Sequence, residues 1–94
     1  LGEDGPTLEI YQYERELDAQ PAAANRRGYG HLAFAVPDVM AARAAVLANG
    51  GGAVGEIVTL ETSDGRRVTW AYVTDPEDNV LELQSWAGPG KSEP

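Results

Sequence analysis

The chain of 94 residues is short, acidic and free of cysteine, with a formal net charge of −8. This length suits a single small domain. The absence of cysteine excludes a disulfide framework, a thiolate nucleophile and a cysteine-based zinc site. The negative charge argues against a nucleic-acid partner, because binding a phosphate backbone needs a basic stripe. No signal-peptide pattern opens the chain and no apolar run approaches the roughly 20 residues that cross a bilayer, so we expect a cytoplasmic protein without a membrane partner.

The first patterned stretch is Thr7-Leu8-Glu9-Ile10-Tyr11-Gln12-Tyr13. Its alternation and its aromatic and β-branched content predict a strand, with Glu9, Tyr11 and Tyr13 on one face. From this segment alone, Glu9 is best explained as a solvated residue on an edge strand. Residues 14–28 are polar and have no sustained period, so they predict a linker between two structural units.

The next stretch, residues 28–39, carries the only histidine of the chain. It opens with glycines, continues as a short apolar run and stops at a Pro-Asp pair. Side chains alternate between the faces of a strand, so its large residues are expected to face a core: Leu32, Phe34 and Val36. The opposite face carries His31 followed by two alanines. Small neighbours leave room beside the imidazole, which suggests a site.

A helix is expected directly afterwards. Asp38 is a favourable N-cap, and the alanine-rich run from Val39 to Asn49 ends at three consecutive glycines, residues 50–52. Its buried stripe is predicted to contain the following residues: Val39, Ala42, Val46 and Leu47. The alanines allow the helix to lie close to a sheet.

Three strands are predicted to follow, over residues 56–61, 67–74 and 79–86. Ser63-Asp64-Gly65 predicts a tight reversal between the first two, and residues 75–78 predict a turn before the third. The polar tail, residues 88–94, is expected to be loose. The sequence therefore predicts one α+β unit over residues 29–87, in the order strand, helix, strand, strand, strand.

In the last strand, Leu81 and Leu83 alternate with Glu82. If the leucines pack on the helix, Glu82 points from the opposite face of the sheet, which is also the face of His31. The first and last strands of such a unit can lie side by side. An imidazole beside a carboxylate suits a divalent ion such as zinc, nickel, manganese or ferrous iron. Alternation alone leaves a solvated, structural His and Glu at least equally plausible.

Three runs of this sequence, at this spacing, closely resemble one module of the vicinal oxygen chelate superfamily. They are Gly-His-Leu-Ala-Phe-Ala-Val-Pro-Asp-Val, Ala-Ala-Arg-Ala-Ala-Val-Leu-Ala-Asn-Gly-Gly and Trp-Ala-Tyr-Val-Thr-Asp-Pro-Glu-Asp-Asn-Val-Leu-Glu-Leu. The superfamily includes glyoxalase I, methylmalonyl-CoA epimerase, extradiol dioxygenases, and fosfomycin and bleomycin resistance proteins. The resemblance implies that residues 29–87 form the second βαβββ module of a glyoxalase/bleomycin-resistance/dioxygenase fold. It also implies that residues 1–13 hold the last strand of a preceding module.

The resemblance further implies a set of metal ligands. His31 matches the first-strand ligand, Glu82 the last-strand ligand, and Glu9 the last-strand ligand of the preceding module. The remaining ligand position, in the first strand of the preceding module, has no counterpart in this sequence. We therefore expect a truncated protein, or a two-module cup that is completed by a homodimer partner or by the missing first module. Asp78 stands where the family usually has glycine, which affects the geometry of the turn more than ligation.

The implied function is that of a metal-dependent lyase or isomerase of the glyoxalase type, with nickel, zinc, iron or manganese. It would act on a small substrate with vicinal oxygens by proton transfer through a metal-stabilised enediolate, with Glu82 or Glu9 as general base. The residues expected to shape the substrate pocket are Tyr11, Trp70 and Tyr72. Two alternatives stay open: a ring-cleaving extradiol dioxygenase, in which Glu9 would not ligate, and a non-catalytic binding protein of the bleomycin-resistance type.

Overall fold

The computed structural model describes residues 2–18, 27, 30–88 and 91–92. Its elements in chain order are β1 (Leu32–Ala35), α1 (Val39–Ala48), β2 (Gly52–Glu61), β3 (Arg67–Thr74), β4 (Val80–Gly88) and β5 (Lys91–Ser92). The predicted α+β unit is therefore present, with its elements in the expected order.

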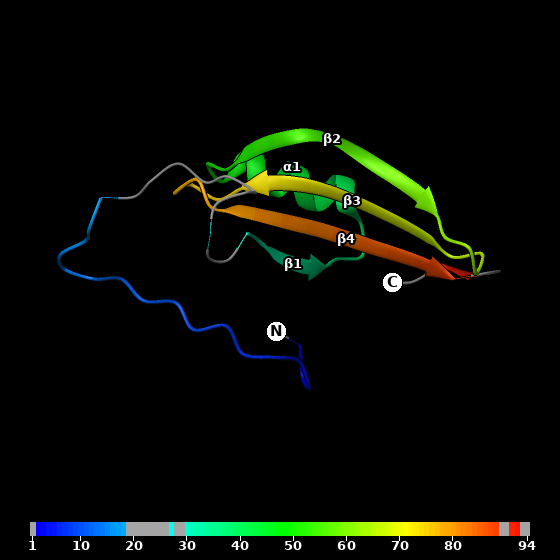
Figure 1. The fold of residues 1–94 in the computed structure, drawn as a ribbon, viewed down its shortest axis with the longest axis horizontal. Helices are drawn as coiled ribbons and strands as arrows, with labels where there is room; N and C mark the ends of the chain where they lie inside the picture. The colour runs from blue at the N-terminus through cyan, green and yellow to red at the C-terminus, as the bar shows by residue number, and fades with distance from the viewer. Residues whose placement is uncertain (1, 19–26, 28–29, 89–90, 93–94) are drawn as a thin grey trace.

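The strands form one mixed sheet in the order β1-β4-β3-β2, and α1 packs on one of its faces (Figure 1). Strand β1 runs parallel to β4, whereas β4, β3 and β2 pair in antiparallel fashion. The first and last strands of the unit thus lie side by side, as the sequence predicted. This arrangement is compatible with a βαβββ module.

Helix α1 begins and ends where its sequence predicts. The Asp38 side chain accepts a hydrogen bond from the Ala41 amide at 3.1 Å, which caps the first turn. After the cap at Asn49 the chain turns at Gly50, whose φ of 94° is a conformation that glycine adopts without steric cost.

The core lies between α1 and the central strands and contains Val39, Ala71, Val73 and Leu83. The helix contacts β2, β3 and β4. Strand β1 is an edge strand beside this covered area, and Leu32 is 46% exposed. Leu32 lies opposite Leu81, which packs against the core, so it is on the expected face, but its place in the edge strand leaves it exposed rather than buried.

The predicted stripe of the helix is confirmed at Val39, Ala42 and Val46, which pack in or against the core. Leu47 is 41% exposed and does not belong to that stripe. The apolar stripe of the helix therefore consists of the other three residues.

The N-terminal stretch differs from its prediction. Residues 2–18 are exposed and contain no helix or strand, although the pattern of residues 7–13 predicts a strand. A strand is stabilised by pairing its backbone groups with a neighbour and by burying one face, and alternation supplies neither by itself. The assignment of residues 1–13 to a preceding module stays a prediction. The predicted linker has no regular structure over residues 14–18, and residues 19–26 and 28 lie outside the described residues.

Two further boundaries differ. Strand β2 begins at Gly52 rather than at Glu56, because a bulge between Val54 and Val58, with Gly55 at φ 71°, continues the pairing with β3. In the tail that was expected to be loose, Lys91–Ser92 pairs with the end of β4. Residues 89, 90, 93 and 94 lie outside the described residues.

In the described part of the chain, no helix has the length and apolar character needed to cross a membrane.

Candidate metal-binding site

His31 and Glu82 meet on the face of the sheet that α1 leaves uncovered. In the β1–β4 ladder Ala33 lies opposite Glu82, and His31 precedes Ala33 by two residues, so its side chain projects from the same face. The Nε2 atom of His31 lies 3.0 Å from Oε1 of Glu82, within hydrogen-bonding distance. The structure thus confirms that these two predicted site residues come together.

The two side chains differ in exposure. Glu82 is the buried charged residue of the described chain, at 9% exposure, whereas about a third of the His31 side chain, 36%, is open to solvent. A carboxylate taken out of water needs hydrogen-bond or charge partners. The pair therefore combines a shielded anion with an imidazole that a small ligand can reach.

Tyr72 forms a third side of this site. It lies directly opposite Glu82 in the β3–β4 ladder, and its ring stands edge-on to the His31 ring with centroids 5.1 Å apart. Burial raises the pKa of the Tyr72 phenol, and the charge of Glu82 and a hydrogen bond to it act in the same direction. Tyr72 is therefore a neutral hydroxyl beside the carboxylate over the whole range of ordinary pH.

A line of polar contacts extends from Glu82 along the same face of β4. Gln84 donates from Nε2 to Oε2 of Glu82. Trp86 in turn donates from its indole Nε1 to Oε1 of Gln84 at 3.2 Å. Oε1 of Glu82 thus contacts His31 and Oε2 contacts Gln84, and the Tyr72 hydroxyl is a third hydrogen-bond partner of the carboxylate.

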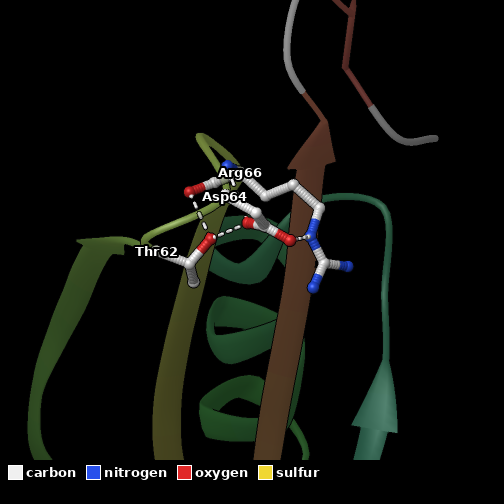
Figure 2. A network of polar contacts seen from close by, with 3 residues as sticks. All are labelled: Thr62, Asp64 and Arg66. Carbon is white, nitrogen blue, oxygen red and sulfur yellow. Dashed lines mark hydrogen bonds and ion pairs between the residues drawn. The ribbon is translucent and has the colours of Figure 1, made fainter.

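The far end of this line meets the turn between β2 and β3. The Arg66 guanidinium lies over the Trp86 ring, 4.7 Å from its centroid. Figure 2 shows how the turn orients Arg66: its Nε donates to Asp64 at 2.9 Å, and the Thr62 hydroxyl donates to the same carboxylate. The hydrogen bond from Thr62, then the backbone and guanidinium of Arg66, hold the pKa of Asp64 below its ordinary value of 3.8.

The donor atoms of the His31–Glu82 pair fit a divalent ion. Imidazole nitrogen and carboxylate oxygen are the ligand types that zinc, nickel, manganese and ferrous iron accept. The Nε2 to Oε1 distance of 3.0 Å is that of an ordinary hydrogen bond, so a metal ion would take the place of the proton between the two atoms.

The structure does not bring the other predicted ligand to this pair. Glu9 is exposed in the N-terminal stretch, where its Oε2 accepts a hydrogen bond from the Tyr11 hydroxyl at 3.3 Å. The described residues contain no group of three or more His, Cys, Asp or Glu side chains placed to hold a metal ion. Of the three predicted ligands, the described structure therefore brings two together, His31 and Glu82.

The predicted pocket residues separate in the same way. Tyr72 contacts His31, and Trp70 lies opposite Gln84 on the same sheet face, both half-buried. Tyr11 is 67% exposed and stacks on Tyr13, with centroids 6.2 Å apart. The strand prediction for residues 7–13 was the only basis for placing Tyr11 in the pocket, and the structure does not bear it out.

The sequence reasoning missed the supporting residues Gln84, Trp86 and Arg66. The alternation that placed Glu82 on the open face also places Gln84 and Trp86 there, at two-residue intervals. That signal was present in the sequence. The contact with Arg66 depends on how the turn between β2 and β3 folds, which alternation does not reveal.

No family model, curated protein or solved structure matches this chain.

Proposed function

We propose that the His31–Glu82 pair is one half of a divalent metal site, and that the protein is a metal-dependent lyase or isomerase of the glyoxalase type. The observation that carries this proposal is the 3.0 Å approach of an accessible imidazole and a shielded carboxylate on the open sheet face. The module fold of the vicinal oxygen chelate superfamily is part of the same proposal. It is supported by the sheet order and by the sequence resemblance.

When bound, the metal ion would supply a Lewis acid that polarises the adjacent oxygens of a small substrate. His31 would hold it through Nε2 and Glu82 through Oε1. We further propose that the carboxylate of Glu82 takes a proton from carbon next to a carbonyl and returns it to the neighbouring carbon. The Tyr72 hydroxyl hydrogen-bonds to Glu82 and would help to hold that carboxylate in place.

The remaining ligands are proposed to come from a facing unit. Two protein ligands leave at least half of a metal's coordination positions to other groups. The face that carries His31 and Glu82 is open, so a second copy of the chain or a preceding module can cover it. Glu9 would join the site only if the N-terminal stretch became a strand in such an assembly.

The test is proton exchange at carbon in D₂O. The metal-loaded protein is incubated with small α-hydroxy ketones and hemithioacetals, and incorporation of deuterium next to the carbonyl is followed by NMR. We expect incorporation with wild type and a loss of at least 100-fold in Glu82→Gln, because the base is removed. Absence of exchange in the loaded wild-type protein for every substrate would contradict a lyase or isomerase.

One observation keeps the dioxygenase alternative open. Glu9 does not join His31 and Glu82 in the described structure, and one further histidine would complete the set of two histidines and one carboxylate of non-haem iron oxygenases. Oxygen consumption by the iron-loaded protein with catechols separates the two functions. Consumption without deuterium exchange would favour the dioxygenase.

A further inference from the structure

Gln84 lies between two groups with opposite hydrogen-bonding capacity. The carboxylate of Glu82 can only accept hydrogen bonds, and the indole nitrogen of Trp86 can only donate one. Gln84 contacts both, donating through Nε2 to Glu82 and accepting through Oε1 from Trp86. A side-chain amide combines a donor and an acceptor at the required separation, whereas a carboxylate, an ammonium group or an alkyl group lacks one or both.

These two contacts also fix which way round the amide lies. The oxygen and nitrogen of a glutamine amide are usually assigned from their surroundings, because they are nearly alike in shape. Here Trp86 requires the oxygen on its side, and Glu82 requires the nitrogen on the other. The orientation of Gln84 is therefore determined from both ends.

Trp86 is itself held from outside the site. The Arg66 guanidinium covers its ring at 4.7 Å, and Asp64 fixes the guanidinium by a hydrogen bond of 2.9 Å (Figure 2). A cation over an indole face is attracted to the ring's negative π surface. A continuous set of contacts thus runs from the β2–β3 turn through Trp86 and Gln84 to Glu82.

We infer that Gln84 is a positioning residue for Glu82: it holds Oε2 of the carboxylate, and so leaves Oε1, beside His31, as the oxygen offered to a ligand. This inference rests on the proposed metal site and adds to it which carboxylate oxygen binds. Without Gln84 the carboxylate loses the partner that holds Oε2, and only His31 and the Tyr72 hydroxyl would restrain its rotation about the last bond. Trp86 contributes by keeping the donor side of the amide turned toward Glu82.

The test compares Co²⁺ binding, followed by visible absorption, in wild type, Gln84→Leu and Trp86→Phe. Gln84→Leu keeps much of the side-chain volume but removes both hydrogen bonds. Removal of a residue hydrogen-bonded to a metal ligand typically weakens metal binding about 10–100-fold. We expect a loss of that size with a changed absorption spectrum in Gln84→Leu, and a smaller loss in Trp86→Phe. Thr69→Val is the control, since Thr69 bonds Thr59 at 3.0 Å and touches none of these groups.

A metal-free measurement separates this inference from the proposed function. The ¹³Cδ resonance of Glu82 and the ¹⁵Nε2 resonance of His31 report the carboxylate contacts in the apo protein. We expect both to shift in Gln84→Leu and to stay unchanged in Thr69→Val. If wild type binds no Co²⁺, the proposed metal site fails, and these resonances still decide the positioning role. Unchanged resonances in Gln84→Leu, or Co²⁺ binding by it with wild-type affinity and spectrum, would overturn the inference.

Discussion

At the scale of single residues, Asp78 occupies a position that favours glycine. Its φ is 70°, in the left-handed region that L-residues avoid. Among the described residues, Asp78 is the one non-glycine residue with a positive φ. Its amide donates to the Asp75 carbonyl at 3.0 Å, which closes the turn before β4. Asp78 thus stands at a position where glycine is favoured on steric grounds.

Replacing Asp78 with glycine is therefore expected to stabilise the protein. Relief of the left-handed conformation is worth about 1–2 kcal/mol, of which the greater freedom of glycine in the unfolded chain cancels a part. We expect Asp78→Gly to raise the free energy of unfolding by about 0.5–1 kcal/mol, measured by urea denaturation. Asp78→Ala is the control and is expected to give no gain. A lower stability for Asp78→Gly than for Asp78→Ala would contradict this explanation.

Asp75 organises the same turn and makes its stability depend on pH. Its carboxylate accepts hydrogen bonds from the Glu77 amide at 2.9 Å and from the amide and side chain of Asn79 at 2.8 and 2.9 Å. Burial pushes the pKa of Asp75 upward, but these hydrogen bonds outweigh it and hold the pKa below 3.8. A carboxyl group with a lowered pKa in the folded state stabilises above its unfolded pKa, and that contribution is lost as the pH falls.

We therefore expect wild type to be more stable than Asp75→Asn at pH 7, by about 1–2 kcal/mol, because the charged acceptor is lost. The difference should shrink as the pH falls below 3.8, where the wild-type carboxyl takes up a proton. Urea denaturation of both proteins between pH 2 and 7 measures it. A constant difference across that range would show that the charge of Asp75 has no part in the turn.

At the scale of elements, the close approach of α1 to the sheet depends on Gly51. A Cβ atom at this position would collide with the Thr74 carbonyl oxygen and with a methyl group of Val46, both inside normal contact distance. The Gly51 amide also donates to the Val46 carbonyl at 2.9 Å, so the backbone cannot move away freely. The junction between α1 and β2 therefore excludes any side chain.

Gly51→Ala is expected to lower the free energy of unfolding by about 1–3 kcal/mol, the range for overpacking a tight site. Gly30→Ala is the matched control, because a Cβ there meets no atom within 4 Å. Thermal and urea denaturation compare the two variants with wild type. Equal stability of the two variants would mean that the junction relaxes without cost.

The elements also separate what the sequence can predict from what it cannot. The N-cap at Asp38, the strand directly after His31 and the β4 position of Glu82 follow from residue type and local period, and the structure confirms them. The exposure of Leu32 depends on where the helix lies across the sheet, which local patterns do not contain. The strand predicted around Glu9 would need a neighbouring strand, and alternation does not reveal whether one is present. The ligand role of Glu9 depends on the same neighbour and stays a prediction.

At the scale of the whole molecule, the face opposite α1 carries apolar side chains beside the candidate site. Val54, Val58 and Leu60 of β2 are 42%, 41% and 54% exposed, and they lie opposite the open-face residues of β3. Contiguous apolar surface on a small domain commonly marks an interface. This face fits the proposed pairing with a second copy or a preceding module.

We expect the chain to form homodimers through this face at micromolar concentration, measured by sedimentation equilibrium. Val58→Lys places a charge in the apolar area and should weaken dimerisation at least tenfold. Thr59→Lys adds the same charge on the opposite face of the same strand, so it should leave dimerisation unchanged. A monomeric wild type, or equal effects of the two lysines, would argue against this interface.

The claim that His31 and Glu82 bind a divalent metal is tested most directly by metal content. Wild type, His31→Ala and the control Thr69→Val are loaded with nickel or zinc, freed of excess ion and measured by elemental analysis. Since His31 supplies a ligand to the proposed site, we predict bound metal in wild type and Thr69→Val and its loss in His31→Ala. Metal near zero in all three proteins, or equal metal in all three, would contradict the site and leave the pair as a hydrogen-bonded contact on an open sheet face.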